Sequence, residues 1–260
     1  MMKRRMKMTI PKLAIIDGDI IAYRAAFWAD VEGIEELESR LQQDIDNWTP
    51  SDCSDVLVAL SCKRKHNFRK DFWNSYKEHR NSVSSPESLG YCKELLGDMF
   101  DSIEEPRLEA DDLMGIYISK GDAIGITIDK DLRTIPGYHW NPDKEKNPVH
   151  VTEKEADFFF HQQWMQGDST DGIPGLWRVG PKKAIKFINS IIEEDGNVIE
   201  AIFNEYDTEK RPNELEMDTY DFALSMARCV RILRDGEYDF ETKEIKLWEP
   251  KVGYSDSKET

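Results

Sequence analysis

The sequence predicts an α/β protein in which a mainly parallel central sheet is flanked by helices and followed by a helical part. Three short apolar runs, each followed by a helical pattern, predict the sheet, because strands that alternate with helices usually pair in parallel. The helical part is predicted by a change after about residue 151, where helical patterns alternate with Gly and Pro turns. We therefore expect an α/β core over residues 13–150 and a helical subdomain over residues 151–250.

The elements of the expected core follow in chain order. The first strand covers residues 13–17, and a helical pattern of apolar side chains starts at Gly18. Residues 30–55 hold nine acids and one base on a helical pattern, which favours a solvated helix face. A second strand is expected over residues 55–61 and a third over residues 122–129. Helices are expected at about 69–79, 86–100 and 110–119, with a further helix or turn from Lys130.

The expected subdomain consists of helices up to a short C-terminal segment. Residues 236–250 alternate apolar and polar side chains, which predicts a terminal strand or hairpin. In open parallel sheets, ligands bind outside the carboxyl ends of the strands, so that edge is where functional residues are expected. The four helical patterns of the subdomain cover residues 153–166, 182–192, 198–206 and 217–233.

Composition excludes several classes of protein. The chain has 260 residues, 39% of them hydrophobic, and no window approaches the run of about 18 apolar residues that a membrane-spanning helix needs. The basic N-terminal run meets Asp17 before any long apolar stretch, so no export is indicated and a cytoplasmic location is expected. The four cysteines contain no CxxC pair, which argues against a zinc cluster and a disulfide framework.

The charge is unevenly distributed along the chain. The chain has 35 Lys and Arg against 51 Asp and Glu, a net charge of −16, yet residues 62–80 hold seven bases against two acids, with aromatic side chains between them. Arg178, Lys182, Lys183 and Lys186 form a second basic island in a stretch without acids. Because distant charges are screened over about 8 Å at physiological salt, both islands can bind phosphates. The alternative is that they only balance an acidic surface.

Acids occur where the expected strands end and where one expected helix begins. Helix starts favour acids in any protein, because carboxylates cap free amide groups, and this alternative stays open. Carboxylates that meet at one sheet edge repel one another unless cations neutralise them, and oxygen ligands favour Mg²⁺ or Mn²⁺ over zinc. Together with the basic islands, they suggest a metal-dependent nuclease. The acids are Asp17, Glu109, Asp111, Asp112, Asp129 and Asp131.

The segment GDSTDGIPGLWRVGPKKA, residues 167–184, carries two more acids, Asp168 and Asp171, and then opens a helix with two lysines. Glycines allow close approach of the backbone to phosphate, and amide groups at a helix start face an anion, so a helix-hairpin-helix phosphate clamp is expected. The alternatives are Asx turns for the acids and an ordinary helix connection for the rest. Trp177 is either a packing residue or a contact to a sugar or base.

These segments together resemble the 5′ nuclease superfamily, and most closely the short bacteriophage 5′→3′ exonucleases. The resemblance implies a PIN-like, resolvase-like core that hydrolyses phosphodiesters from the 5′ end of duplex DNA with two divalent metal ions, Mg²⁺ or Mn²⁺. It also implies a monomer without a membrane partner, in the host cytoplasm if phage-encoded, whose substrates include flaps or RNA paired with DNA. The matching pieces are IDGD at 16–19, FRKDFWNSYKEHR at 68–80, LEADD at 108–112, IDKDL at 128–132, residues 167–184 and residues 226–250.

The resemblance also implies roles for individual residues. The six acids of the core would surround a first metal. Asp168 and Asp171 would hold a second, with Asp129 and Asp131 shared between the two or reaching toward the second. Asp17, Asp111 and Asp129 would be catalytic, with Lys77 and Arg80 beside the scissile phosphate. DNA contacts are expected from Arg69, Lys70, Tyr76, Lys77, Arg80, Gly175, Val179, Gly180, Lys182 and Lys183.

One position departs from the family pattern, because Cys62 stands where an Asp usually ends the second strand. This departure allows a catalytically weak, structure-specific DNA-binding protein as an alternative. A second alternative is an aspartyl-phosphate phosphatase, because Asp17-Gly-Asp19 resembles the nucleophile loop of that class, with Asp17 as the nucleophile.

Overall fold

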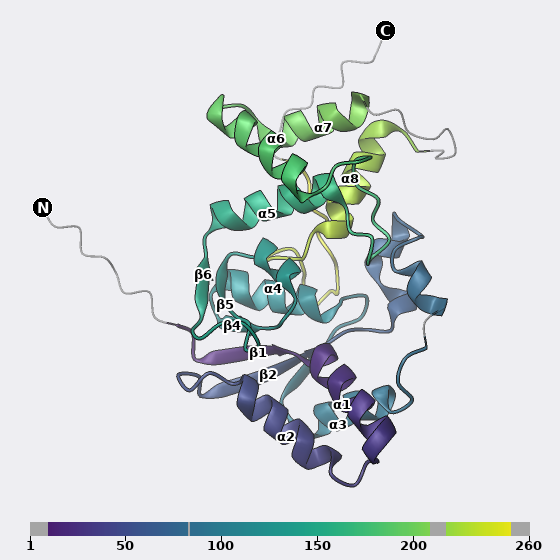
Figure 1. The fold of residues 1–260 in the computed structure, drawn as a ribbon, viewed down its shortest axis with the longest axis vertical. Coiled ribbons are helices and arrows are strands. Elements are labelled where there is room, and N and C mark those ends of the chain that lie inside the picture. The colour runs from purple at the N-terminus through teal and green to yellow at the C-terminus, as the bar shows by residue number, and fades with distance from the viewer. Residues whose placement is uncertain (1–9, 83, 209–216, 251–260) are drawn as a thin grey trace, which may run out of the picture. The chain divides into compact units, whose positions relative to one another are not determined.

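The computed structural model describes residues 10–82, 84–208 and 217–250 (Figure 1). The chain divides into two compact units, a sheet unit and a helical unit, which are described separately. The sheet unit comprises Met1–Phe68, Ser84–Ala156 and Ile232–Glu244, and the helical unit comprises Arg69–Val83, Asp157–Arg231 and Ile245–Thr260.

The units exchange segments along the chain, whereas the sequence suggested a single boundary near residue 150. Residues 69–83 group with the helical unit, although they lie in the first third of the sequence. Residues 232–244 return to the sheet unit after the last helix. Each unit is therefore assembled from segments that are far apart in sequence.

The sheet unit has a six-stranded sheet with the strand order β3-β2-β1-β4-β5-β6, in which only β6 is antiparallel to its neighbour. This confirms the predicted α/β class and the three predicted strands. The short strands β3, β5 and β6 were not predicted. The strands are β1 (Leu13–Asp17), β2 (Asp55–Leu60), β3 (Ser102–Glu104), β4 (Ala123–Ile126), β5 (Gly137–Trp140) and β6 (Val149–Val151).

Helices cover both faces of this sheet. Figure 1 shows α1, α2 and α3 on one face and α4 on the other. The first face packs through buried side chains such as Ile16 of β1, Ile21 of α1, Leu41 of α2 and Leu96 of α3. Burial of these side chains supplies the main stabilisation of this layer. The helices are α1 (Gly18–Glu32), α2 (Leu37–Trp48), α3 (Leu89–Met99) and α4 (Ala110–Lys120).

The helical unit has a core of large aromatic side chains. Trp164 is fully buried and donates from Nε1 to the Ala223 carbonyl at 2.8 Å, and the Tyr206 hydroxyl donates to the Trp164 carbonyl at 2.7 Å. These bonds satisfy the polar atoms of buried aromatic residues. The four helices that frame this core agree with the predicted ranges to within a few residues: α5 (Glu153–Gln166), α6 (Pro181–Glu193), α7 (Val198–Thr208) and α8 (Thr219–Val230).

One predicted element is wrong, and the C-terminal one takes the second of its two predicted forms. The helix expected at 69–79 is replaced by two 3₁₀ turns, Phe68–Asp71 and Glu78–Ser82, with Lys77 at a φ of 53° between them. A positive φ interrupts an α-helix, because neither side can continue its hydrogen-bond ladder through that residue. For residues 236–250 the hairpin alternative applies: the described residues there contain no strand, but Tyr238 and Ile245 are bridge residues on either side of a turn in which the Asp239 N–H donates to the Glu244 carbonyl.

Within the described ranges, no helix is long and apolar enough to cross a membrane.

Candidate active site and nucleic-acid interface

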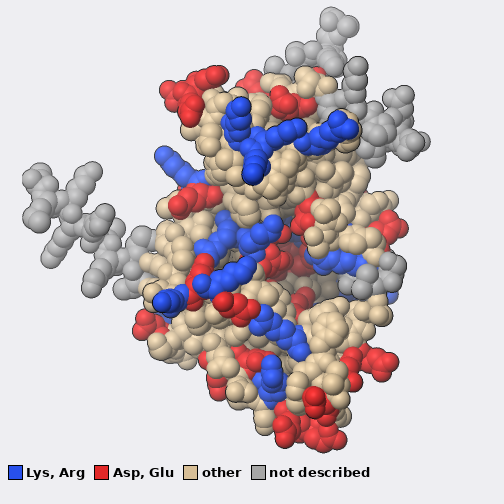
Figure 2. Space-filling model, viewed as in Figure 1, with Lys and Arg blue, Asp and Glu red and all other residues tan. Residues whose placement is uncertain are grey.

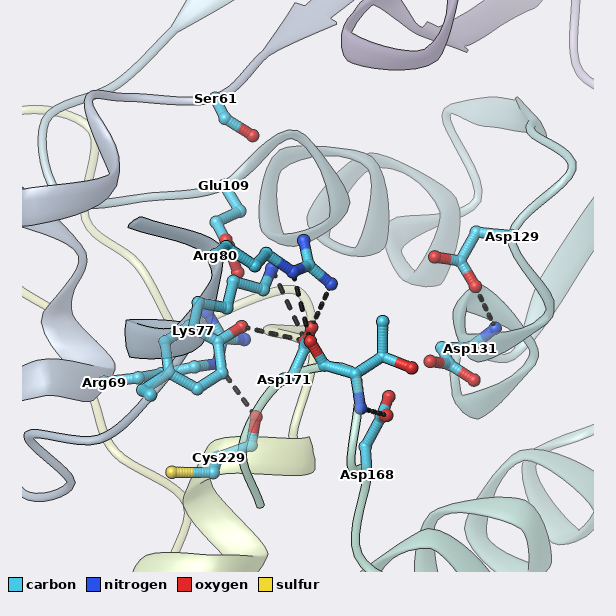
Figure 3. A network of polar contacts seen from close by, with 12 residues as sticks. Ser61, Arg69, Lys77, Arg80, Glu109, Asp129, Asp131, Asp168, Asp171 and Cys229 are labelled. Atoms are coloured by element: carbon cyan, nitrogen blue, oxygen red, sulfur yellow. Dashed lines mark hydrogen bonds and ion pairs between the residues drawn. The ribbon is translucent and has the colours of Figure 1, made fainter. Parts of the chain in front are cut away.

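Two predicted acids follow neighbouring strands of the sheet. Asp17 ends β1, which pairs in parallel with β4, and its Oδ2 accepts a hydrogen bond of 2.9 Å from the Thr127 hydroxyl just beyond β4. The same hydroxyl accepts a bond of 3.0 Å from the Asp129 backbone N–H. Asp129 in turn accepts from the Asp131 backbone N–H at 2.9 Å (Figure 3). One threonine therefore connects the acids that follow β1 and β4.

Asp17 lies in an environment that disfavours its negative charge. Burial is the main cause that raises the pKa of its carboxyl to about 7, and the nearby charges of Asp19 and Asp129 act in the same direction. The hydrogen bonds from Thr127 and from the Ile20 backbone N–H oppose this shift. The Asp17 carboxyl is therefore protonated more readily than an exposed aspartate, and a bound cation would favour its charged form.

Asp19 has a cation of its own within the sheet unit. Its Oδ1 accepts from Lys93 Nζ of α3 at 2.6 Å and from the Ser61 backbone N–H at 3.2 Å. The Ser61 hydroxyl accepts from the Ala110 backbone N–H at 2.8 Å, at the start of α4. Ser61 therefore links the acids beyond β1 with the acidic helix start.

The acids at the start of α4 serve first to begin that helix. Glu109 is the N-cap and forms a capping box with Asp112, whose Oδ2 accepts from the Glu109 backbone N–H at 3.1 Å. Asp112 is fully buried, and its Oδ1 accepts from the Leu233 backbone N–H at 3.3 Å. Asp111 and Glu109 are half-buried. The capping alternative thus accounts for the contact of Asp112 with Glu109, while Glu109 and Asp111 lie closer to the surface.

Cys62 lies beside this helix start. Its backbone N–H donates to the Leu108 carbonyl at 2.9 Å, and its thiol is half-buried. Burial raises the pKa of the thiol to about 11, and the charges of Glu109 and Asp112 raise it as well. The thiol is therefore protonated at neutral pH. It lies near Glu109 and Asp112, at the position where the family pattern has an aspartate.

The donor set at this edge fits a hard divalent cation. Carboxylate and hydroxyl oxygens are the ligands that Mg²⁺ and Mn²⁺ take, and Asp17 is a buried carboxyl with the acidic neighbours Asp19 and Asp129, whose charges a cation would offset. Among the residues that the structure describes, no three His, Cys, Asp or Glu side chains form a ready-made metal site.

In the helical unit, the two basic residues expected beside the scissile phosphate contact a carboxylate that was expected to bind metal. Arg80 donates to Asp171 Oδ1 at 2.5 Å and to the Thr170 carbonyl at 3.1 Å, and Lys77 Nζ lies 3.4 Å from Asp171 Oδ2 (Figure 3). The Tyr76 hydroxyl also contacts Asp171 Oδ2, at 3.3 Å. We call Tyr76, Lys77, Arg80 and Asp171 the Asp171 cluster. It brings both basic groups to one carboxylate.

Asp168 and Asp171 occupy a closed loop. Asp168 exchanges two backbone hydrogen bonds of 2.8 Å with Ile173, and its Oδ1 accepts from the Thr170 backbone N–H at 2.7 Å. The second contact is the Asx turn that the sequence left as an alternative. This turn fixes the loop through Oδ1 of Asp168, and Oδ2 takes no part in the turn.

Two residues expected to contact DNA are buried in the helical unit. Arg69 is 2% exposed, and its guanidinium donates to the carbonyls of Cys229 at 3.0 Å and Arg231 at 2.6 Å. Tyr76 is also 2% exposed, with the Arg69 guanidinium over its ring. Since these contacts place both side chains inside the unit, we assign them a structural role. Lys70 is half-buried.

The glycine-rich hairpin combines internal and exposed positions. Gly175 has a φ of 61°, and an added Cβ would lie 2.3 Å from the Gly167 backbone nitrogen, so this glycine permits two backbones to touch. Val179 packs against the core of the unit. By contrast, Gly180 is the exposed N-cap of α6, and Lys182 and Lys183 are exposed in its first turn. Figure 2 shows basic side chains gathered where α6 lies.

Sequence reasoning missed Thr127, Lys93 and the role of Ser61. Thr127 directly follows β4 and directly precedes the IDKDL segment at 128–132, so its position in the sequence offered a signal. Lys93 carries no such signal, because its partner Asp19 lies 74 residues away in the chain. Its contact with the acidic edge depends on the packing of α3.

Comparison with known proteins gives a consistent set of relatives, although no family model matches the sequence. The chain is 31% identical to an exonuclease of Escherichia phage T7 in an alignment of 225 residues that covers 74% of this chain and 74% of that protein. It is 30% identical to an exodeoxyribonuclease of Enterobacteria phage T3 over 226 residues, with 75% and 74% covered. It is also 28% identical to DNA polymerase I of Rhizobium leguminosarum, covering 76% of this chain and 20% of that protein.

Solved structures share the fold. A T5 5′-exonuclease with bound zinc ions matches with a TM-score of 0.58 and 18% identity, covering 84% of this chain and 88% of that one. A bacteriophage T5 flap endonuclease in complex with DNA and metal ions matches with a TM-score of 0.53 and 19% identity, covering 84% and 85%. At these identities the likeness concerns the arrangement of helices and strands.

Proposed function

Because the chain belongs to the 5′ nuclease superfamily and, within it, to the group of phage exonucleases, we propose that it removes short products from the 5′ end of duplex DNA by metal-dependent hydrolysis. The observation that carries this proposal is the acidic edge where Asp17, Asp19 and Asp129 follow β1 and β4. A buried carboxyl with two acidic neighbours is a suitable place for a divalent cation. The solved structures that share this fold contain bound metal ions, and one of them is a complex with DNA.

The proposed metal ligands divide between the two units. In the sheet unit, Asp17, Asp129 and Asp131 would hold an ion together with Glu109 and Asp111, while Asp112 fixes the helix start behind them. In the helical unit, Asp168 and Asp171 would hold a second ion. Divalent ions of this kind, Mg²⁺ or Mn²⁺, would supply an activated water and would stabilise the entering and leaving oxygens of a phosphodiester.

Lys77 and Arg80 have two successive partners in this proposal. In the free protein they neutralise Asp171. With a divalent ion at Asp171, Lys77 and Arg80 would be available to a phosphate and would stabilise the negative charge that develops on it.

Duplex DNA is proposed to bind through its backbone. Lys182 and Lys183 are exposed beside the open Gly180 at the start of α6, where backbone amide groups and lysine charges together favour phosphate. Such contacts carry little sequence information, so flaps and RNA paired with DNA are further proposed substrates. The proposed working state is a monomer.

The proposal is tested with Asp129→Asn on 5′-labelled duplex DNA in Mg²⁺. Since this change removes a ligand charge but keeps the side-chain shape, cleavage is expected to be lost while binding persists. Asp98→Asn, at an exposed position of α3, is the matched control and should cleave as the unchanged protein does. Near-normal turnover of Asp129→Asn at saturating Mg²⁺ would overturn the metal assignment. The same assay separates two alternatives, since a phosphatase would release only free phosphate and a DNA-binding protein would bind without cleaving.

The DNA contact is tested by replacing Lys182 and Lys183 together with alanine. Binding should weaken, and the slope of log affinity against log salt should fall by about 1 unit for each lost phosphate contact. The double variant Lys144→Ala with Lys146→Ala removes the same charge from exposed positions elsewhere and should keep the slope. An unchanged salt slope in Lys182→Ala with Lys183→Ala would mean that the hairpin only connects two helices and does not bind phosphate.

A further inference from the structure

The tip of the glycine-rich hairpin exposes a large aromatic side chain. Trp177 is 69% exposed, although tryptophan is a residue that folded proteins usually bury. The Arg178 guanidinium carbon lies 3.9 Å from the centre of the Trp177 ring, so the two planar groups are in direct contact. The hairpin therefore presents a flat aromatic surface with a positive charge beside it.

The backbone holds this surface at some cost. Arg178 has a φ of 57°, a conformation that is unfavourable for a long side chain by about 1 kcal/mol or more. Its carbonyl accepts a hydrogen bond of 3.0 Å from Lys183 Nζ, which ties the tip to the first turn of α6. The tip and the exposed lysines therefore form one connected surface.

The surroundings of Trp177 have a charge that suits nucleic acid. No acid occurs between Gly172 and Lys186, in a chain whose net charge is −16. The lysines of this island provide partners for phosphate, but an exposed aromatic ring contributes nothing to phosphate binding. A ring beside phosphate contacts has a natural partner in the face of a nucleobase, which stacks on aromatic side chains at about 1–3 kcal/mol per base.

We propose that Trp177, backed by Arg178, is a stacking site for an unpaired nucleobase next to the phosphates that Lys182 and Lys183 hold. The inference rests on the proposed function and adds a substrate preference to it. In an intact duplex the base faces are covered by their neighbours, so the site selects DNA with a single-stranded extension or a frayed end. The lysines alone do not distinguish such DNA from a blunt duplex.

The test measures binding without cleavage, in EDTA, by the anisotropy of labelled DNA. Three DNAs share one duplex: a blunt form, a form with a short single-stranded extension, and a form whose extension lacks bases. The unchanged protein should bind the extended DNA about tenfold more tightly than either of the others. Trp177→Ala should bind all three alike, and Trp177→Phe should retain most of the preference.

Two controls separate stacking from other effects. Trp177→Ala should leave the salt slope unchanged, whereas Lys182→Ala with Lys183→Ala should lower it on every DNA. Phe27→Ala removes a side chain that is 58% exposed on α1 and should change nothing, which excludes a general effect of lost apolar surface.

The outcomes distinguish this inference from the proposed function. Equal affinity of the unchanged protein for the blunt and the extended DNA, or a preference that survives Trp177→Ala, would overturn the stacking site. A preference that persists on the extension without bases would overturn it too, because it would assign the contact to the sugar and phosphate. A base-dependent preference in a protein that cleaves nothing in Mg²⁺ would support stacking while refuting the nuclease.

Discussion

Single residues of the same type have opposite roles in this protein, and their contacts decide which role applies. Arg69 and Arg80 lie in one basic segment, and the sequence assigned both to nucleic acid. Arg69 donates inward to two backbone carbonyls, whereas Arg80 is about one-third exposed and pairs with Asp171. The difference depends on partners about 160 residues away for Arg69, which no local pattern reveals.

We predict that Arg69→Gln reduces the free energy of unfolding by about 2–4 kcal/mol, because it leaves buried carbonyls without charged donors. Urea denaturation measures this loss. The salt slope of DNA binding should stay as it is in the unchanged protein. A lower slope with normal stability would return Arg69 to the nucleic-acid interface.

Cys62 offers a second test at the residue scale. Its half-buried thiol borders Glu109 and Asp112, so Cys62→Asp would add a carboxylate next to the proposed first ion. Because the affinity for hard ions follows the number of charged oxygen ligands, the Mg²⁺ concentration for half-maximal cleavage should fall severalfold. Cys53→Asp, at another half-buried cysteine, is the control. A destabilised Cys62→Asp with unchanged metal dependence would point to Ser61 as the position that faces the ion.

At the scale of elements, the sequence predicted those helices and strands whose apolar patterns are long enough to be distinctive. The predicted α5 matches the observed helix from Glu153 to Gln166. The strands β3, β5 and β6 were missed because three or four residues hold too little of an alternating pattern. The helix expected at 69–79 failed because its apolar side chains serve tertiary contacts, such as the bond of 2.9 Å from Trp73 Nε1 to the Gly172 carbonyl.

The candidate site shows the same division between local and distant information. Asp17, Asp129 and Asp131 could be predicted because parallel strands bring their carboxyl ends to one edge. The hydrogen bond from the Leu233 backbone N–H to Asp112 could not, because the two residues are 121 positions apart. Positions at the ends of neighbouring parallel strands could therefore be predicted from the sequence, whereas contacts with a distant segment of the chain could not.

Two glycines within helices, Gly90 and Gly115, should respond in opposite ways to replacement by alanine. In α3, an added Cβ on Gly90 meets nothing within 4 Å, so Gly90→Ala should stabilise the protein by about 0.5–1 kcal/mol through helix propensity. In α4, a Cβ on Gly115 would lie 2.4 Å from the Leu233 carbonyl oxygen, so Gly115→Ala should destabilise it by about 1–3 kcal/mol. Thermal unfolding of both variants measures the contrast, and stabilisation by Gly115→Ala would contradict the close packing of α4 against residue 233.

At the scale of the whole molecule, a buried histidine should make stability depend on pH. Burial lowers the pKa of His139 on β5 to about 4, against 6.5 in the unfolded chain. Between these values the unfolded chain binds a proton that the folded chain does not, so the free energy of unfolding should fall as the pH falls from about 6.5 to 4, by up to about 3 kcal/mol.

The variant His139→Gln isolates this contribution, because glutamine can still donate to the Ile135 carbonyl that His139 contacts at 2.8 Å. Urea denaturation at pH 7.5 and 5.0 should show a smaller difference in this variant than in the unchanged protein. His66→Gln, at an exposed position, should keep the full difference. Equal pH dependence in all three proteins would contradict a neutral, buried His139.

The contact between Asp112 and Leu233 has a consequence for how the protein is made. A ribosome adds residues from the N-terminus, so the acids of α4 emerge long before Leu233, which follows 121 residues later. Until then, Asp112 lacks its backbone donor, and Gly115 lacks the neighbours at residues 232 and 233 against which it packs. A nascent chain therefore completes the acidic helix start late in translation, and premature termination before residue 233 would leave the proposed metal site unfinished.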